Sequence, residues 1–203
     1  MPFIQEVQKV LAHEGGYAYV LGDKGGETYK GITRVNFPNW PGWLIVDKYK
    51  PLKHNQVIKD AALDNLVQQF YKKYFWDSLN IDLLPTPVQG LLFDFAINSG
   101  TGTASKAFQK VVRDTTGANI VIDGNIGKGT ISAATKANQK VLFDRLKTYR
   151  ANYYQAIVNK NPGQKKFLDG WLNRLNSYEF KAAAISFGIF FFGALILIYL
   201  NKD

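Results

Sequence analysis

The sequence has no cysteine, only two histidines and a single methionine among its 203 residues. The absence of cysteine excludes disulfide bonds and thiolate-bound metals, and His13 and His54 alone do not suffice for a structural zinc site. We therefore predict no metal site. Residues 1–6 lack both the positive charge and the long apolar stretch of a secretory signal, so no signal peptide is predicted.

Acidic residues are scarce relative to basic ones: 16 aspartates and glutamates against 25 lysines and arginines give a net charge of +9. A positive surface suits a polyanion, here nucleic acid, anionic lipid or a bacterial wall carrying peptide carboxylates. The alternative is that the excess lysine only confers solubility. The chain has no basic helix with interleaved aromatic residues and no recognisable nucleic-acid-binding module, so nucleic acid is not a predicted partner.

The apolar pattern predicts a mainly α fold of the α+β class, with one small sheet near the N-terminus. Apolar residues at helical spacing predict a helix over residues 3–13. Residues 17–20 and 27–33, separated by a glycine-rich turn, predict a β-hairpin. Helices are then predicted over 57–62, 64–74, 88–98, 103–115, 130–136, 140–160 and 167–178, with loops over 36–42 and 117–129.

A lone carboxylic acid, Glu14, follows the first predicted helix. The end of an apolar helix disfavours a carboxylate through desolvation and through the helix dipole, which suits a general acid that must stay protonated near neutral pH. The hairpin can fold Asp23 and Thr28 back over this end of the helix, giving the two carboxyl groups of a glycosidase and a hydroxyl to position water. The alternatives are a surface glutamate in a turn and an aspartate that only makes an Asx turn.

Five motifs in order resemble the N-acetylmuramidases of glycoside hydrolase family 108, over roughly residues 3–178. They are His13-Glu14-Gly15-Gly16-Tyr17 with Asp23 to Thr33, Phe75-Trp76-Asp77, Leu92 to Gly100, Asp123-Gly124-Asn125-Ile126-Gly127, and Phe167 to Arg174. The spacing of Glu14, Asp23 and Thr28 also resembles the site of phage-type lysozymes.

The resemblance implies a lysozyme-like catalytic region over 1–100 and a helical peptidoglycan-binding lobe over 101–180. It implies a peptidoglycan-degrading muramidase, acting without a cofactor on the β-1,4 bond between N-acetylmuramic acid and N-acetylglucosamine, with Glu14 as the acid. Asp23 is then a nucleophile, a water-activating base or a scaffold residue, since Lys24 replaces the proline that often follows it in the family. The alternatives are a lytic transglycosylase and a non-catalytic wall-binding membrane protein.

Further residues are predicted to contact substrate. Trp40 and Trp43, on a proline-flanked loop, can stack on sugar rings or belong to the core, and Tyr17 lies within the catalytic motif. Asp94 and Asn98 lie one helical turn apart; they can bind sugar hydroxyls, although a buried aspartate more often satisfies backbone amides, and Asn98 can end its helix. The loop 123–127 can bind the wall or simply cap the next helix.

The segment from Ala182 to Leu200 carries no charged residue and is close to the ~20 residues that span a bilayer. We predict a C-terminal transmembrane anchor over 181–203, with a buried core helix as the alternative. The prediction implies a single-pass protein of a bacterial inner membrane or of the inner membrane of a lipid-containing phage. Its partners would then be the bilayer and, if it is virion-associated, capsid or other membrane proteins. The implied role is phage lysis or wall penetration during entry.

Overall fold

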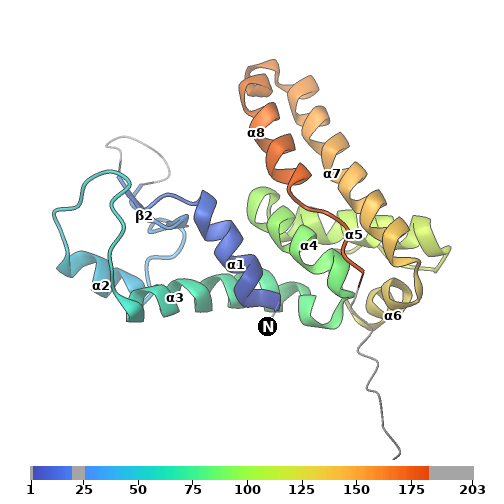
Figure 1. Cartoon of the computed structure of the whole chain (residues 1–203), viewed down its shortest axis with the longest axis horizontal. Helices are drawn as coiled ribbons and strands as arrows, with labels where there is room; N and C mark the ends of the chain where they lie inside the picture. Colours follow the sequence, from blue (N-terminus) through green and yellow to red (C-terminus); the bar gives the residue numbers. More distant parts are fainter. Residues whose placement is uncertain (1, 20–25, 183–203) are drawn as a thin grey trace, which may run out of the picture.

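The computed structural model describes residues 2–19 and 26–182, which form a helical molecule with a small sheet at one end (Figure 1). The helices are α1 (Pro2–His13), α2 (Gly42–Lys48), α3 (Ala61–Tyr71), α4 (Thr86–Ser99), α5 (Thr101–Thr116), α6 (Lys128–Lys136), α7 (Gln139–Lys160) and α8 (Lys165–Asn176). The strands are β1 (Tyr17–Ala18), β2 (Thr28–Tyr29) and β3 (Ile32–Thr33). Short 3-10 and π-helical turns connect them: Lys72–Trp76, Asp77–Leu79, Ile81–Leu83 and Pro162–Gln164.

Helix α1 lies between the sheet and the helical bundle (Figure 1). Phe3, Val7 and Val10 recur on one face and are buried, so the helix is held by an apolar stripe, as its sequence predicts. Phe3 packs edge-on against Trp76 and Phe93, which come from the π-helical turn after α3 and from α4. This packing fixes the direction in which the last turn of α1 points, and therefore the position of Glu14.

The sheet is antiparallel in the order β1-β2-β3, with Tyr17 opposite Tyr29 and Thr28 opposite Thr33. The hairpin was predicted with one strand over 27–33, but that segment turns back on itself at Lys30 and Gly31, both at positive φ (49° and 75°). Glycine adopts this conformation without the strain that a Cβ brings. The result is a third strand and a tight turn facing α1.

Two details between the sheet and the bundle differ from the prediction. The helix predicted over 57–62 is wrong: residues 57–60 are not helical, and α3 begins only at Ala61. The carboxylate of Asp60 accepts a hydrogen bond from the backbone of Leu63 at 2.9 Å and caps α3. The short helix α2 was not predicted, because its sequence follows a proline-rich loop and buries only one side, through Trp43 and Val46.

Helix α4 is the centre of the molecule. Every residue from Val88 to Ala96 is buried, because α1, α5 and α7 all pack against this helix. The only charged side chain in that stretch is Asp94, which is 1% exposed. Helices α5 to α8 complete the bundle, and α7 and α8 lie side by side (Figure 1).

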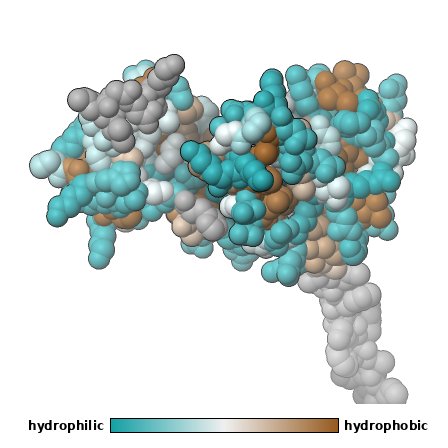
Figure 2. Space-filling view, turned by 90° about the horizontal axis from the view of Figure 1, so that it is seen from above, coloured by the Kyte–Doolittle hydropathy of each residue, from teal (hydrophilic) through white to brown (hydrophobic). Residues whose placement is uncertain are grey.

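The mainly helical fold with a small N-terminal sheet is as predicted, but the predicted transmembrane helix is corrected. Within residues 2–19 and 26–182, no helix is long and apolar enough to cross a membrane. The most apolar helix, α4, has 14 residues and contains Asp94, and the face seen in Figure 2 is largely hydrophilic. Of the predicted anchor over 181–203, residues 183–203 lie outside the described part of the chain. The single-pass membrane localisation and the bilayer and virion partners inferred from it are not retained.

Candidate active site

Glu14 lies directly at the C-terminal end of α1. Its backbone N–H donates to the carbonyl oxygen of Val10 at 3.2 Å, so the residue continues the last helical turn. The following glycines permit a close chain crossing: a Cβ atom on Gly16 would lie 2.3 Å from the carbonyl oxygen of Gln56. Tyr17 continues this crossing with a backbone hydrogen bond to the same carbonyl at 2.9 Å. Backbone hydrogen bonds before and after Glu14 thus fix the position of this half-buried residue.

The carboxylate of Glu14 packs against the turn between β2 and β3. A Cβ atom added to Gly31 would lie 2.8 Å from Glu14 Oε2 and 2.7 Å from the hydroxyl oxygen of Tyr71. The Tyr71 hydroxyl donates to the carbonyl oxygen of Lys30 at 2.8 Å. Burial, followed by the negative charge of Glu14, raises the pKa of Tyr71, so this phenol stays protonated. Glu14, Gly31 and Tyr71 therefore form one cluster built from α1, the sheet and α3.

Thr28 belongs to the hairpin beside this cluster. Thr28 lies on β2, half-buried, and its hydroxyl donates to the carbonyl oxygen of Ala18 at 3.4 Å. Asp23 lies outside the described residues. The predicted roles of these two residues in catalysis remain predictions.

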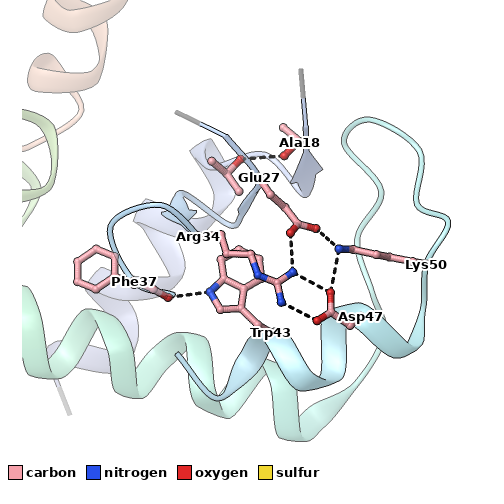
Figure 3. Close-up of polar contacts among 8 residues, drawn as sticks. Ala18, Glu27, Arg34, Phe37, Trp43, Asp47 and Lys50 are labelled. Atoms are coloured by element: carbon pink, nitrogen blue, oxygen red, sulfur yellow. Dashed lines mark hydrogen bonds and ion pairs between the residues drawn. The ribbon is translucent and has the colours of Figure 1, made fainter. Parts of the chain in front are cut away.

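A cluster of four charged side chains fixes the base of the hairpin, and we call Glu27, Arg34, Asp47 and Lys50 the hairpin brace (Figure 3). Arg34 contacts Glu27 and Asp47 at 2.6 Å each, and Lys50 contacts the same two carboxylates at 2.5 and 2.8 Å. Figure 3 shows both cations between the two acids. The sequence did not point to this brace, because its members are spread over the hairpin, α2 and the chain after it.

The brace keeps Glu27 ionised. Burial raises the pKa of Glu27, but hydrogen bonds from Lys50 and Arg34 outweigh it and lower the pKa below its ordinary value. A carboxylate held by two cations cannot serve as a proton donor near neutral pH. Glu27 thus has a structural role in the brace, to which Glu14 does not belong.

Two of the residues predicted to contact substrate are buried beside the brace. Trp43 is 2% exposed; its ring lies under the Arg34 guanidinium, and its Nε1 donates to the carbonyl oxygen of Phe37 at 2.8 Å. Tyr17 is 8% exposed, and burial and its hydrogen bond to Glu27 raise the pKa of its phenol. The Arg34 guanidinium covers the ring of Trp43, whereas Tyr17 borders a hollow of about 520 Å³ with Lys50 and His54. The predicted roles of Trp43 and Tyr17 in substrate binding stay predictions.

Trp40 borders a hollow of about 410 Å³ between the loop 36–41 and one face of α3. The lining combines aromatic rings and amide side chains, including Phe37, Tyr74, Asn39 and Gln69. The ring of Trp40 packs edge-on against Trp43, which holds it in place. Such a lining suits an amino sugar, whose ring stacks on aromatic faces and whose acetamido group hydrogen-bonds to amides.

Asp94 is held by two guanidinium groups in the interior. Arg150 of α7 contacts its Oδ2 at 2.5 Å, and Nε of Arg174 on α8 contacts its Oδ1 at 2.7 Å. Asn98, one turn on, donates to the backbone carbonyl oxygen of Asp94 at 2.8 Å. Asp94 is thus a buried ion-pair centre. Neither Arg150 nor Arg174 carries a local sequence signal, although Arg174 ends a motif that resembles the muramidase family.

The loop 123–127 is fixed from inside the bundle. The buried side chain of Gln109 on α5 donates to Asp123 Oδ1 at 2.7 Å and to the carbonyl oxygen of Asn125 at 2.9 Å. The same amide accepts a hydrogen bond from the backbone of Gly124 at 2.7 Å, and Asn80 donates to the carbonyl oxygen of Ile126 at 3.0 Å. Both side-chain amides therefore hold the loop's shape.

Comparisons with known proteins divide the chain into two matches. Residues 7–100 match the family Glycosyl hydrolase 108, and residues 103–176 match the family Predicted Peptidoglycan domain. Among solved structures, that of Brucella abortus SagA is similar to this one, with a TM-score of 0.56 and 25% sequence identity. The similarity covers 87% of this chain and 94% of the SagA chain. No curated protein matches.

Proposed function

Because this chain belongs to the glycosyl hydrolase 108 family through residues 7–100 and carries a peptidoglycan domain after them, we propose that Glu14 is the general acid with which it cleaves peptidoglycan. The family makes the chain a glycoside hydrolase acting on peptidoglycan, a muramidase. The observation that supports Glu14 is its half-buried carboxylate, packed on Gly31 and Tyr71 at the end of α1.

In the proposed reaction, Glu14 donates its proton to the oxygen that links C1 of N-acetylmuramic acid to N-acetylglucosamine. The C1–O bond breaks, and positive charge develops at the anomeric carbon of the muramic acid. Water then adds to that carbon and loses a proton, which restores the acid form of Glu14 directly or through solvent, and the product carries a reducing end. Asp23 and Thr28 are proposed to position this water or to stabilise the charge, and the brace at Glu27 holds the strand that carries Thr28.

Trp40 is one of the aromatic residues that we propose as glycan contacts. It borders the hollow between the loop 36–41 and α3, where Tyr74 is 40% exposed and can stack on a sugar ring. The predicted division into regions 1–100 and 101–180 also stays a proposal, as does the predicted setting of phage lysis.

The decisive change is Glu14→Gln, which keeps the size and hydrogen-bonding shape of the side chain but removes its acidic proton. General acid catalysis contributes about 10²–10⁴-fold, so we expect release of muropeptides from purified peptidoglycan to fall at least ~100-fold. Mass spectrometry of the soluble products gives both the rate and the end group. Reducing muramic acid ends are expected, whereas anhydro ends would indicate a lytic transglycosylase.

Glu179→Gln is the matched control, because Glu179 is an exposed glutamate outside the candidate site. This variant is expected to digest peptidoglycan at the wild-type rate. If Glu14→Gln and Glu179→Gln are equally active, Glu14 is not the acid. If the wild-type protein binds peptidoglycan without releasing any product, a wall-binding role replaces the enzymatic one.

A further inference from the structure

The hollow beside Trp40 has a wall of three aromatic rings in mutual contact. The ring centroids of Phe37, Phe70 and Tyr74 lie 4.6, 5.0 and 4.8 Å apart, pair by pair. The two sides of the hollow are also joined to each other, because Nε1 of Trp40 donates to the carbonyl oxygen of Leu66 on α3 at 3.4 Å. These contacts hold the wall in place, so a sugar ring meets a surface that is already formed.

The hollow and the candidate acid are connected through α3. Phe70, in the wall of the hollow, packs edge-on against Tyr71 with the ring centroids 5.7 Å apart. The hydroxyl of Tyr71 lies at the Gly31 turn, on which the carboxylate of Glu14 also packs. Peptidoglycan is a chain of linked sugars. A sugar that is not itself cleaved can therefore occupy the hollow while another sugar of the same strand lies at Glu14.

Lys73 is the one charged side chain among the described residues that line the hollow. It is exposed, and its Nζ lies 5.2 Å from the centroid of the Tyr74 ring. Within residues 2–19 and 26–182, no ion pair joins Lys73 to a carboxylate, whereas the neighbouring Lys72 is paired with Asp77. The aromatic ring holds the ammonium group at the hollow, and its N–H donors are left for an anionic ligand.

We propose that Lys73 is a specificity-determining residue that pairs with a carboxylate carried by the glycan strand in the hollow. The protein then binds anionic peptidoglycan more tightly than a neutral polymer of N-acetylglucosamine. The rings and amides of the hollow contact features that both polymers share, and Lys73 responds to the difference in charge. Peptidoglycan offers the carboxylate from two sources: the lactyl group of a peptide-free muramic acid and the stem peptide. The inference rests on the proposed function, whose substrate it places in the hollow.

The test removes the charge from each partner in turn. Soluble glycan strands are compared with the same strands after their carboxylates are converted to amides, which changes the charge but hardly the size. For the wild-type protein, amidation is expected to raise KM by about 3–5-fold, the upper range for an exposed ion pair, with little change in kcat. Lys73→Gln is expected to show the higher KM with both forms and thus no response to amidation.

Peptide-free strands and strands that carry stem peptides are measured separately. A response of the wild-type protein with peptide-free strands identifies the lactyl carboxylate as the partner of Lys73. A response with the stem-bearing strands alone identifies the stem peptide. If the wild-type protein and Lys73→Gln respond equally to amidation with both kinds of strand, the proposal is overturned.

Two further variants separate a local ion pair from a general effect of charge. Lys73→Arg keeps the charge and is expected to retain the wild-type response. Lys59→Gln removes the same charge from an exposed position before α3 that does not line the hollow, and it is also expected to behave as wild type. Loss of the response in Lys59→Gln as well would overturn the proposal. Because Lys73 is exposed, Lys73→Gln is expected to fold, which circular dichroism checks.

These outcomes are separate from those that test Glu14. Full activity of Glu14→Gln removes the proposed acid but leaves the comparison of KM values intact. If the wild-type protein releases no product, the same comparison is made on Kd, from the tryptophan fluorescence of the wild-type protein and Lys73→Gln as the strands are added. Loss of activity in Glu14→Gln with an equal response to amidation in Lys73→Gln keeps the acid and removes only the inference about Lys73.

Discussion

At the scale of single residues, the site depends on how closely backbone and carboxylate approach one another. Gly31 combines a positive φ of 75° with contacts to Glu14 and Tyr71 that leave no room for a Cβ atom. The shape of the turn thus fixes the position of the Glu14 carboxylate, the proposed proton donor. The backbone of any other residue at this position would be strained, because L-residues adopt this conformation at a cost of about 1–2 kcal/mol.

Gly31→Ala is therefore expected to impair both stability and activity. The strain alone lowers the free energy of unfolding by about 1–2 kcal/mol, and displacement of the Glu14 carboxylate is expected to lower kcat at least ~10-fold, since small misplacements of catalytic groups are costly. Thermal melts and muropeptide release measure the two effects separately.

Gly117→Ala is the matched control for that substitution. Gly117 ends α5 at a φ of 71°, but an added Cβ would meet nothing within 4 Å. Gly117→Ala is expected to lose only the ~1–2 kcal/mol of backbone strain and to keep full activity. Equal kcat values for Gly31→Ala and Gly117→Ala would show that the turn does not position Glu14.

At the scale of elements, the hairpin is too short to hold its own shape. Its three strands have two residues each, and an isolated two-stranded hairpin is marginal in water. The hairpin brace supplies the missing stability by joining Glu27 to α2 through Arg34 and Asp47 (Figure 3). The structural role of the brace is to keep the hairpin over the end of α1.

The brace predicts a pH-dependent contribution to stability. The pKa of Glu27 is lowered in the folded state, so its contribution is present above the ordinary value of 4.5 and is lost as the pH falls through the lowered value. Glu27→Gln is expected to reduce the free energy of unfolding by about 1–3 kcal/mol at pH 7, and by less near pH 3. Urea unfolding at pH 7 and near pH 3 measures the two losses. An equal loss of unfolding free energy at both pH values would contradict the prediction.

Most helices could be predicted from sequence, because the apolar spacing that marks α1 or α7 is local. The candidate acid could be found for the same reason: Glu14 and its glycines are neighbours in the chain. Tyr71 could not, since it reaches Glu14 through packing of α3 against the turn between β2 and β3, which no short pattern records. The membrane segment was predicted from hydropathy alone, and the helices of the described ranges do not support it.

At the scale of the whole molecule, the two family matches share one core. Helix α4 falls in the first match, yet it packs against α5 and α7 of the second. The ring centroids of Phe95 on α4 and Tyr153 on α7 lie 5.5 Å apart. Both arginines that pair with Asp94 come from the second match, Arg150 from α7 and Arg174 from α8. The two matches therefore do not correspond to two independently stable bodies.

A fragment of residues 1–100 is accordingly expected to lack a cooperative thermal transition and to be inactive, whereas residues 1–181 are expected to melt cooperatively and digest peptidoglycan. The fragment leaves the carboxylate of Asp94 without either arginine, and breaking a buried ion pair costs about 3–5 kcal/mol. Exposure of Phe95 and its apolar neighbours adds about 1.5–3 kcal/mol for each large side chain. Together these losses reach the ~5–15 kcal/mol that holds a typical domain folded. Near-UV circular dichroism measures the thermal transition, and muropeptide release measures the activity. A fragment 1–100 that melts cooperatively and cleaves the wall would show that the first match folds and works without the second.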